Sequence, residues 1–103
     1  MSAGWLVRYL LRQQHWSAAT FGLGRRTVGI CRHIASELDE IRAEPTDLSE
    51  WIDVMILAMD GYWRAGGNPA TLPAALLAKQ RVNLARRWPA PQPEDEPTRH
   101  LSE

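Results

Sequence analysis

The sequence has little that would link the chain covalently or carry it across a membrane. Cys31 is the one cysteine among 103 residues, which excludes an internal disulfide and points to a reducing compartment. No apolar run approaches the ~20 residues of a membrane-spanning helix. The stretch from Trp5 to Leu11 lacks the small-residue cleavage site of a signal peptide. We therefore expect a cytoplasmic protein without a membrane partner.

The sequence also lacks an excess of charge of either sign. Its 12 Lys and Arg residues balance 12 Asp and Glu residues, so the formal net charge is zero. Simple nucleic-acid-binding domains are basic, and a neutral chain disfavours that class of partner. Internal repeats and strand-like alternation are absent as well. A chain of this length can bury one modest core, and we expect a single all-α domain.

Four segments carry apolar residues at helical spacing, and helix breakers separate them. The expected helices cover about residues 5–14, 26–42 and 47–64, and a fourth runs from 68 or 71 to 87. Pro45 separates the second from the third, because the residue before a proline disfavours helical backbone. Asp47 then offers an N-cap with Glu50 three residues later. Gly66 and Gly67 should end the third helix.

The end of the chain differs in composition from the rest. Four of the seven prolines lie there, and apolar residues are nearly absent from residue 89 onward. Such a segment cannot bury enough apolar surface to offset the entropy of ordering it. We therefore expect a helical domain over residues 1–88 and a disordered, proline-rich segment over residues 89–103.

Two pairs of acidic residues with the same internal spacing flank Pro45. Glu37 and Glu40 form the first pair, and Glu50 and Asp53 form the second. Residues three apart share one helix face, about 5–6 Å apart at Cβ. Glu40 and Glu50 each lie five residues from Pro45, and Glu37 and Asp53 each lie eight. A helical hairpin turning at Pro45 would therefore bring all four carboxylates level.

Four carboxylates at that spacing repel one another unless a cation joins them. An all-oxygen cluster suits Mg²⁺, with Mn²⁺ as the alternative. Asp53 lies in an otherwise apolar stretch, residues 51–57, and a buried carboxylate there would need a partner. From the residues alone, a metal site and a polar contact between helices are equally well supported.

Longer segments around the acidic pairs carry a family resemblance. Residues 33–66 read HIASELDEIRAEPTDLSEWIDVMILAMDGYWRAG. This stretch resembles the MazG-like all-α nucleoside triphosphate pyrophosphohydrolases, most closely the phage and bacterial branch of dATP/dGTP diphosphohydrolases. The upstream HWSAATFGLGRRTVGICRHI and the downstream AKQRVNLARRWP are similar to the same branch. The resemblance covers about residues 14–89, although the nine residues between Glu40 and Glu50 are fewer than many MazG proteins have there.

The resemblance implies hydrolysis of a (d)NTP, with dATP or dGTP expected, to the monophosphate and pyrophosphate. Mg²⁺ held by Glu37, Glu40, Glu50 and Asp53 would neutralise triphosphate oxygens and lower the pKa of a bound water. In the family this water attacks the α-phosphorus. We assign Glu37 and Glu40 as catalytic residues, with Glu40 as the expected proton acceptor.

Several other residues are candidates for contact with the nucleotide. Asp60 lies two turns beyond Asp53, about 10 Å away, a distance suited to the sugar or base. Trp16, expected in a polar loop, suits base stacking. His33 lies one turn before Glu37 and could touch the substrate. For each of these, an ordinary structural or surface role is the alternative.

Cations near the expected fourth helix and the glycine loop suit phosphate oxygens. The resemblance implies that the region of the fourth helix approaches the substrate, and a solvated basic face is the alternative. The predicted substrate-binding set is Asp60, Lys79, Asn83, Arg86, Arg26, Trp16 and His33.

The third helix should leave apolar surface uncovered, because residues 54–59 are apolar all round. MazG-like proteins are typically dimers or larger. We therefore expect a MazG-like bundle of three to four helices around the central acidic hairpin, completed by oligomerisation in at least a homodimer. The alternatives are a helical module that binds nucleic acid or protein through the basic fourth helix, and a catalytically inactive structural dimer.

Overall fold

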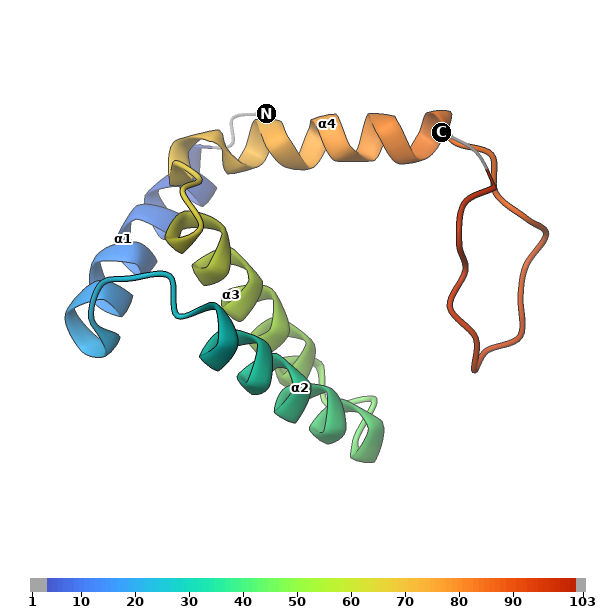
Figure 1. The fold of residues 1–103 in the computed structure, drawn as a ribbon, viewed down its shortest axis with the longest axis horizontal. Helices are drawn as coiled ribbons and strands as arrows, with labels where there is room; N and C mark the ends of the chain where they lie inside the picture. The colour runs from blue at the N-terminus through green and yellow to red at the C-terminus, as the bar shows by residue number, and fades with distance from the viewer. Residues whose placement is uncertain (1–3, 102–103) are drawn as a thin grey trace. The chain divides into compact units, whose positions relative to one another are not determined.

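The computed structural model describes residues 4–101, and the regular elements in that range are helices (Figure 1). They are α1 (Gly4–Phe21), α2 (Thr27–Ala43), α3 (Leu48–Arg64), the short 3-10 helix η1 (Pro69–Thr71) and α4 (Leu72–Ala85). The predicted all-α fold is confirmed. Within the described range, no helix is both long enough and apolar enough to cross a membrane.

The chain divides into two compact units. One ends at Leu72 and contains α1, α2, α3 and η1, and the other begins at Pro73 and contains the rest of α4 and the proline-rich segment. Both acidic pairs belong to the first unit, and so do Trp16 and Phe21 near the C-terminus of α1. The domain boundary that we expect after residue 88 stays a prediction.

Helix α1 is longer than the sequence predicts. It continues past residue 14 through Trp16 and Ser17 and ends at Phe21, where Gly22 and Gly24 take positive φ angles of 87° and 108°. Ser17, one of the polar residues that suggested a loop, is 1% exposed and faces the interior. Trp16 therefore stands on a helix, and its predicted position in a loop is wrong.

Helices α2 and α3 form the predicted hairpin and lie side by side (Figure 1). Four residues, 44–47, connect them. The Asp47 carboxylate caps α3 by accepting a hydrogen bond from the backbone N–H of Ser49 at 3.1 Å. The indole of Trp51 donates to the carbonyl of Pro45 at 3.1 Å, and this hydrogen bond links the connecting residues to the first turn of α3.

The first unit has a small apolar core. Among residues 4–101, the buried apolar side chains are Leu10, Ile41, Pro69 and Leu72. Helix α3 contacts both α1 and α2 and is therefore the central helix of this unit. Four apolar side chains on one side of α3 are nevertheless each at least 50% exposed. We call them the α3 stripe: Leu48, Trp51, Ile52 and Met55. The protein as a single chain therefore leaves much of its apolar surface in contact with water.

In the second unit, the proline-rich segment returns to the end of α4. The backbone N–H of Leu101 donates to the carbonyl of Arg87 at 2.6 Å. The rings of Trp88 and His100 meet edge to face, with their centroids 5.9 Å apart. The Trp88 indole also donates to the carbonyl of Asn83 at 2.7 Å. Residues 89–101 of the segment form no helix, and the disorder that its composition predicts stays a prediction.

Candidate metal and nucleotide site

Three of the four predicted metal ligands come together on the α2–α3 hairpin. One carboxylate oxygen from each of Glu37, Glu40 and Glu50 lies within 4.8 Å of the other two, and we call these residues the acidic cluster. Helix α2 carries two of them three residues apart, and the short turn at Pro45 sets the third opposite. The structure therefore brings these residues together as the hairpin register predicts.

Two carboxylate oxygens of the acidic cluster have no partner within the described residues. The Oε2 atoms of Glu37 and Glu50 are buried without a hydrogen bond, and Glu37 is only 8% exposed. Buried carboxylate oxygens need a donor or a cation. When protonated, the Glu50 carboxyl could donate a hydrogen bond to Glu40 or Glu37, and this, together with burial and their negative charge, raises its pKa to about 7. These features fit a hard divalent cation such as Mg²⁺, whose charge would replace the shared proton.

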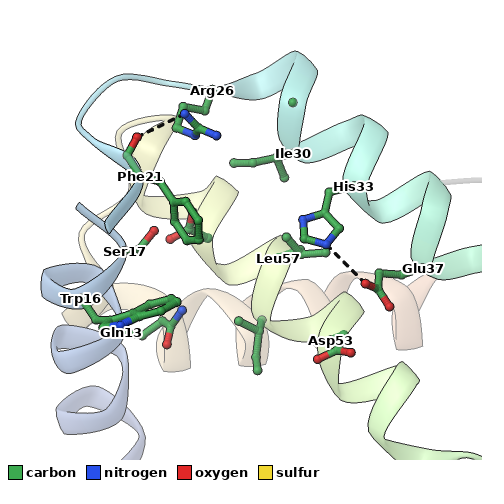
Figure 2. A pocket seen from close by; sticks show the side chains of 13 residues that line it. Gln13, Trp16, Ser17, Phe21, Arg26, Ile30, His33, Glu37, Asp53 and Leu57 are labelled. Carbon is green, nitrogen blue, oxygen red and sulfur yellow. Dashed lines mark hydrogen bonds and ion pairs between the residues drawn. The ribbon is translucent and has the colours of Figure 1, made fainter. Parts of the chain in front are cut away.

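Asp53 stands apart from the acidic cluster. Its carboxylate is not among the oxygens that gather within 4.8 Å, and its side chain is exposed. The expectation that apolar neighbours would bury it is wrong, because Ile52 and Met55 are themselves at least half exposed. Asp53 does line a pocket together with Glu37 (Figure 2). Its role as a fourth metal ligand stays a prediction.

A pocket of about 340 Å³ adjoins the acidic cluster in the first unit (Figure 2). Binding sites for small ligands typically enclose about 300–1,000 Å³. The walls come from α1, α2 and α3, and Glu37 belongs to both the cluster and the pocket. The lining residues are Gln13, Trp16, Ser17, Phe21, Arg26, Gly29, Ile30, His33, Glu37, Asp53, Ile56, Leu57 and Asp60.

The pocket has an acidic end and an aromatic end (Figure 2). At the acidic end, the Nε2 atom of His33 lies 3.3 Å from Oε1 of Glu37. At the aromatic end, the rings of Trp16 and Phe21 meet edge to face with their centroids 5.5 Å apart. The Arg26 guanidinium lies 5.7 Å from the Phe21 ring centroid and donates to the Phe21 carbonyl at 3.1 Å. Both predicted pocket residues from this region, Trp16 and Arg26, therefore lie where a planar, anionic ligand could contact them.

Sequence reasoning missed Arg64, which fixes the wall of the pocket. Its side chain is fully buried, and its Nε donates to Oδ2 of Asp60 at 2.8 Å. Its Nη1 donates to the carbonyls of Gly22 at 2.8 Å and Gly24 at 3.0 Å, and its Nη2 donates to Oγ of Ser17 at 2.8 Å. Arg64 therefore ties α1 and the α1–α2 loop to α3. The i,i+4 spacing from Asp60 is the one sequence signal that could have found it.

Asp60 lines the pocket, but its two oxygens are already engaged. Oδ1 accepts a hydrogen bond from the Trp63 indole at 2.8 Å, and Oδ2 accepts from Arg64. Burial alone would raise the pKa of Asp60, but hydrogen bonds from Arg64, Ser17 and Trp63 outweigh it and hold the pKa below its ordinary value. The structure thus gives Asp60 a part in holding the wall, and its contact with a sugar or base stays a prediction.

The remaining predicted substrate residues are divided between the two units. His33 lines the pocket, whereas Lys79, Asn83 and Arg86 belong to the second unit, where their role stays a prediction. There, Nη1 of Arg86 donates to Oδ1 of Asn83 at 3.1 Å. Gln13 is a pocket residue that sequence reasoning missed, although it lies one helical turn before Trp16.

The all-α fold and the carboxylate-bearing hairpin are those that the resemblance to MazG-like proteins implies. A family model described as dATP/dGTP pyrophosphohydrolase matches residues 10–103, a range that includes the whole acidic cluster and every residue of the pocket. The chain belongs to this family, and the family description is that of a hydrolase. The resemblance drawn from the sequence is confirmed.

One curated relative adds to this assignment. The chain is 35% identical over 101 residues to the Eaa protein of Salmonella phage P22, and the alignment covers 93% of this chain. The chain spans about 30% of that relative's length. No solved structure matches the chain.

Proposed function

We propose that this chain is a Mg²⁺-dependent nucleoside triphosphate pyrophosphohydrolase that cleaves dATP or dGTP to the monophosphate and pyrophosphate. The observation that carries the proposal is the acidic cluster, with its unpartnered buried oxygens, at one end of a pocket that is aromatic at the other. Membership in the dATP/dGTP pyrophosphohydrolase family supports the same reaction. The proposal covers this chain alone, not the longer phage relative.

The two ends of the pocket suit the two ends of a nucleotide. The rings of Trp16 and Phe21 are each about half exposed, at 52% and 48%, and offer surface on which a base can stack. Glu37 at the other end would face the metal-bound triphosphate. His33, beside Glu37, would contact the substrate between the two ends. Arg26 would contribute a positive charge near the phosphates or the sugar.

The chain's own residues would hold the metal and handle the proton. Glu37, Glu40 and Glu50 would bind Mg²⁺, with Mn²⁺ as the alternative and Asp53 as the predicted fourth ligand. When bound, such a metal neutralises phosphate charge and lowers the pKa of a coordinated water. Glu40 is the exposed member of the acidic cluster, and we propose that it accepts the proton of the attacking water. We retain Lys79, Asn83, Arg86 and Asp60 as proposed substrate contacts.

The decisive measurement is a screen of the eight common NTPs and dNTPs with Mg²⁺, in which pyrophosphate and phosphate release are followed separately. We expect pyrophosphate from dATP and dGTP. Glu37→Gln should lower kcat by more than about a hundredfold, the loss expected when a metal ligand or general base is removed. Glu44→Gln, an exposed glutamate at the end of α2 outside the acidic cluster, is the matched control and should retain activity.

A loss of less than about tenfold in Glu37→Gln would count against the metal-dependent mechanism. If neither dATP nor dGTP yields pyrophosphate, and the chain instead binds nucleic acid in a salt-sensitive way, the alternative binding module would be favoured. We further propose that the protein acts in the cytoplasm as a homodimer or larger homo-oligomer. Exposure of the α3 stripe supports the assembly.

A further inference from the structure

Among the described residues at the aromatic end of the pocket, Gln13 is the one side chain that offers both a free donor and a free acceptor. It lies one turn before Trp16 on α1, and both side chains line the pocket (Figure 2). Within the described residues, the carboxamide of Gln13 makes no hydrogen bond. A partly buried carboxamide without partners, beside a ring suited to stacking, has both donors and an acceptor available to a ligand.

The other polar groups near the aromatic end are either engaged or able only to donate. Oγ of Ser17 accepts from Arg64 at 2.8 Å, and the two oxygens of Asp60 accept from Trp63 and Arg64. Arg26 donates to the carbonyl of Phe21. Arg26 keeps further N–H groups and Trp16 keeps its indole N–H, but both offer only donors, whereas the edge of a base presents a donor next to an acceptor.

We propose that Gln13 recognises the base, and this inference rests on the proposed function. Adenine presents an amino donor at N6 next to the N1 acceptor, and guanine presents the O6 acceptor next to the N1–H donor. A carboxamide carries an acceptor oxygen next to a donor nitrogen, so it matches either edge after its oxygen and nitrogen exchange places by rotation. One residue can thus accept both purines.

The carboxamide does not by itself exclude pyrimidines. Cytosine presents the same donor and acceptor order as adenine, and thymine presents the same order as guanine. Preference for purines would come from the rings of Trp16 and Phe21, because a larger base gains more stacking area. The two rings would therefore select the base by its size, and Gln13 would hydrogen-bond its polar edge.

The sharpest test is Gln13→Glu, because a carboxylate only accepts hydrogen bonds. Guanine offers two adjacent donors, N1–H and the 2-amino group, whereas adenine places its N1 acceptor against the carboxylate. The ratio of kcat/KM for dGTP to that for dATP should rise by about tenfold. Gln13→Met, of similar length but without polar atoms, should lower kcat/KM for both purines by a similar factor and leave the ratio unchanged.

Gln14→Glu is the matched control, because it places the same change on the next residue of α1, which does not line the pocket. Its ratio should equal that of the wild type. The ratio of the Kd values of dAMP and dGMP, measured by tryptophan fluorescence, tests the same base preference without turnover. Absence of wild-type hydrolysis would therefore refute the proposed function alone. A Gln13→Glu ratio within about twofold of the wild type, or an equal shift in Gln14→Glu, would overturn the role of Gln13.

Discussion

Glu50 links the stability of the metal-free protein to pH. Contact with Glu40 and Glu37 raises its pKa from 4.5 to about 7. A carboxyl whose pKa is raised in the folded state contributes stability below its unfolded pKa, and that contribution is lost as the pH rises through the folded pKa. The Tm of the metal-free protein should therefore fall between about pH 5 and pH 8. Thermal melts in chelator measure this fall.

Two comparisons isolate the contribution of Glu50. Glu50→Gln, which cannot ionise, should show a flatter dependence of Tm on pH. Mg²⁺ should raise the wild-type Tm more at pH 8 than at pH 5, because the cation and the proton compete for the same oxygens. If the metal-free wild type and Glu50→Gln show the same dependence on pH, the acidic cluster does not share a proton in solution.

Arg64 should be among the most sensitive residues for stability. Removing it leaves the Asp60 carboxylate without its ion pair and leaves the carbonyls of Gly22 and Gly24 without their donor. Breaking a buried pair in this way costs about 3–5 kcal/mol. We expect Arg64→Met to lower the free energy of unfolding by about 3 kcal/mol, measured by urea denaturation.

A surface pair on α2 provides the control for Arg64. Arg42 also bonds an aspartate one turn earlier, Asp39 at 3.0 Å, but both side chains are more than 70% exposed. Exposed pairs contribute little, so Arg42→Met should cost less than about 0.5 kcal/mol. Equal losses in the two variants would show that the buried network around Arg64 contributes no more than a surface contact.

At the scale of helices, the sequence predicts what is decided locally. Pro45 and Asp47 act within one turn of the chain, and the hairpin and its cap form where the sequence places them. Helix α1 continues through Ser17, whose hydroxyl accepts a hydrogen bond from Arg64, 47 residues away. No local pattern contains that contact. The sequence therefore predicts a loop where the folded protein has helix.

The same distinction applies to the candidate site. The acidic cluster could be predicted because the spacing of Glu37 and Glu40 and the register across Pro45 are fixed within the hairpin. The position of Gln13 in the pocket could not be predicted, because it depends on how α1 packs against α3. The exposure of Asp53 could not be predicted either, since it depends on what covers α3 and not on which residues are its neighbours in the chain.

The C-terminus of α3 offers a prediction at the element scale. The N–H of Gly66 donates to the carbonyl of Trp63 at 3.0 Å, and the N–H of Gly67 donates to that of Tyr62 at 2.9 Å, which is the Schellman arrangement. Gly66 has a φ of 115°, a conformation that side chains disfavour. We expect Gly66→Ala to lower the free energy of unfolding by more than about 1 kcal/mol, measured by urea denaturation.

Gly29, in the first turns of α2, is the matched control for Gly66. It has no positive φ, and a Cβ added there would meet no other atom within 4 Å. Alanine restricts the unfolded chain and favours helix, so Gly29→Ala should raise the free energy of unfolding by about 0.5 kcal/mol. A gain in stability from both substitutions would contradict the assignment of Gly66 as the helix-ending residue.

At the scale of the whole molecule, the exposed α3 stripe predicts self-association. Its four side chains stand at positions i, i+3, i+4 and i+7 and are 50–74% exposed, so they form one continuous apolar face. Exposed apolar faces of this kind mark interfaces in soluble proteins. The net charge of the chain is zero, so two copies meet without global repulsion. We therefore expect a homodimer at micromolar concentration, measured by sedimentation velocity.

Met55→Glu places a charge in the middle of the α3 stripe and should shift the protein to monomer, because an unpaired charge is costly to bury at an interface. Val28→Glu makes a similar change at an apolar residue of α2 that is 65% exposed and lies outside the stripe, and it should leave the dimer intact. A monomeric wild type would refute the predicted self-association. A dimer that survives in Met55→Glu but is lost in Val28→Glu would place the contact between copies outside the stripe. Because Glu50 and Asp53 lie on the same helix as the stripe, loss of the dimer should also weaken the binding of Mg²⁺, which titration calorimetry on the Met55→Glu variant would measure.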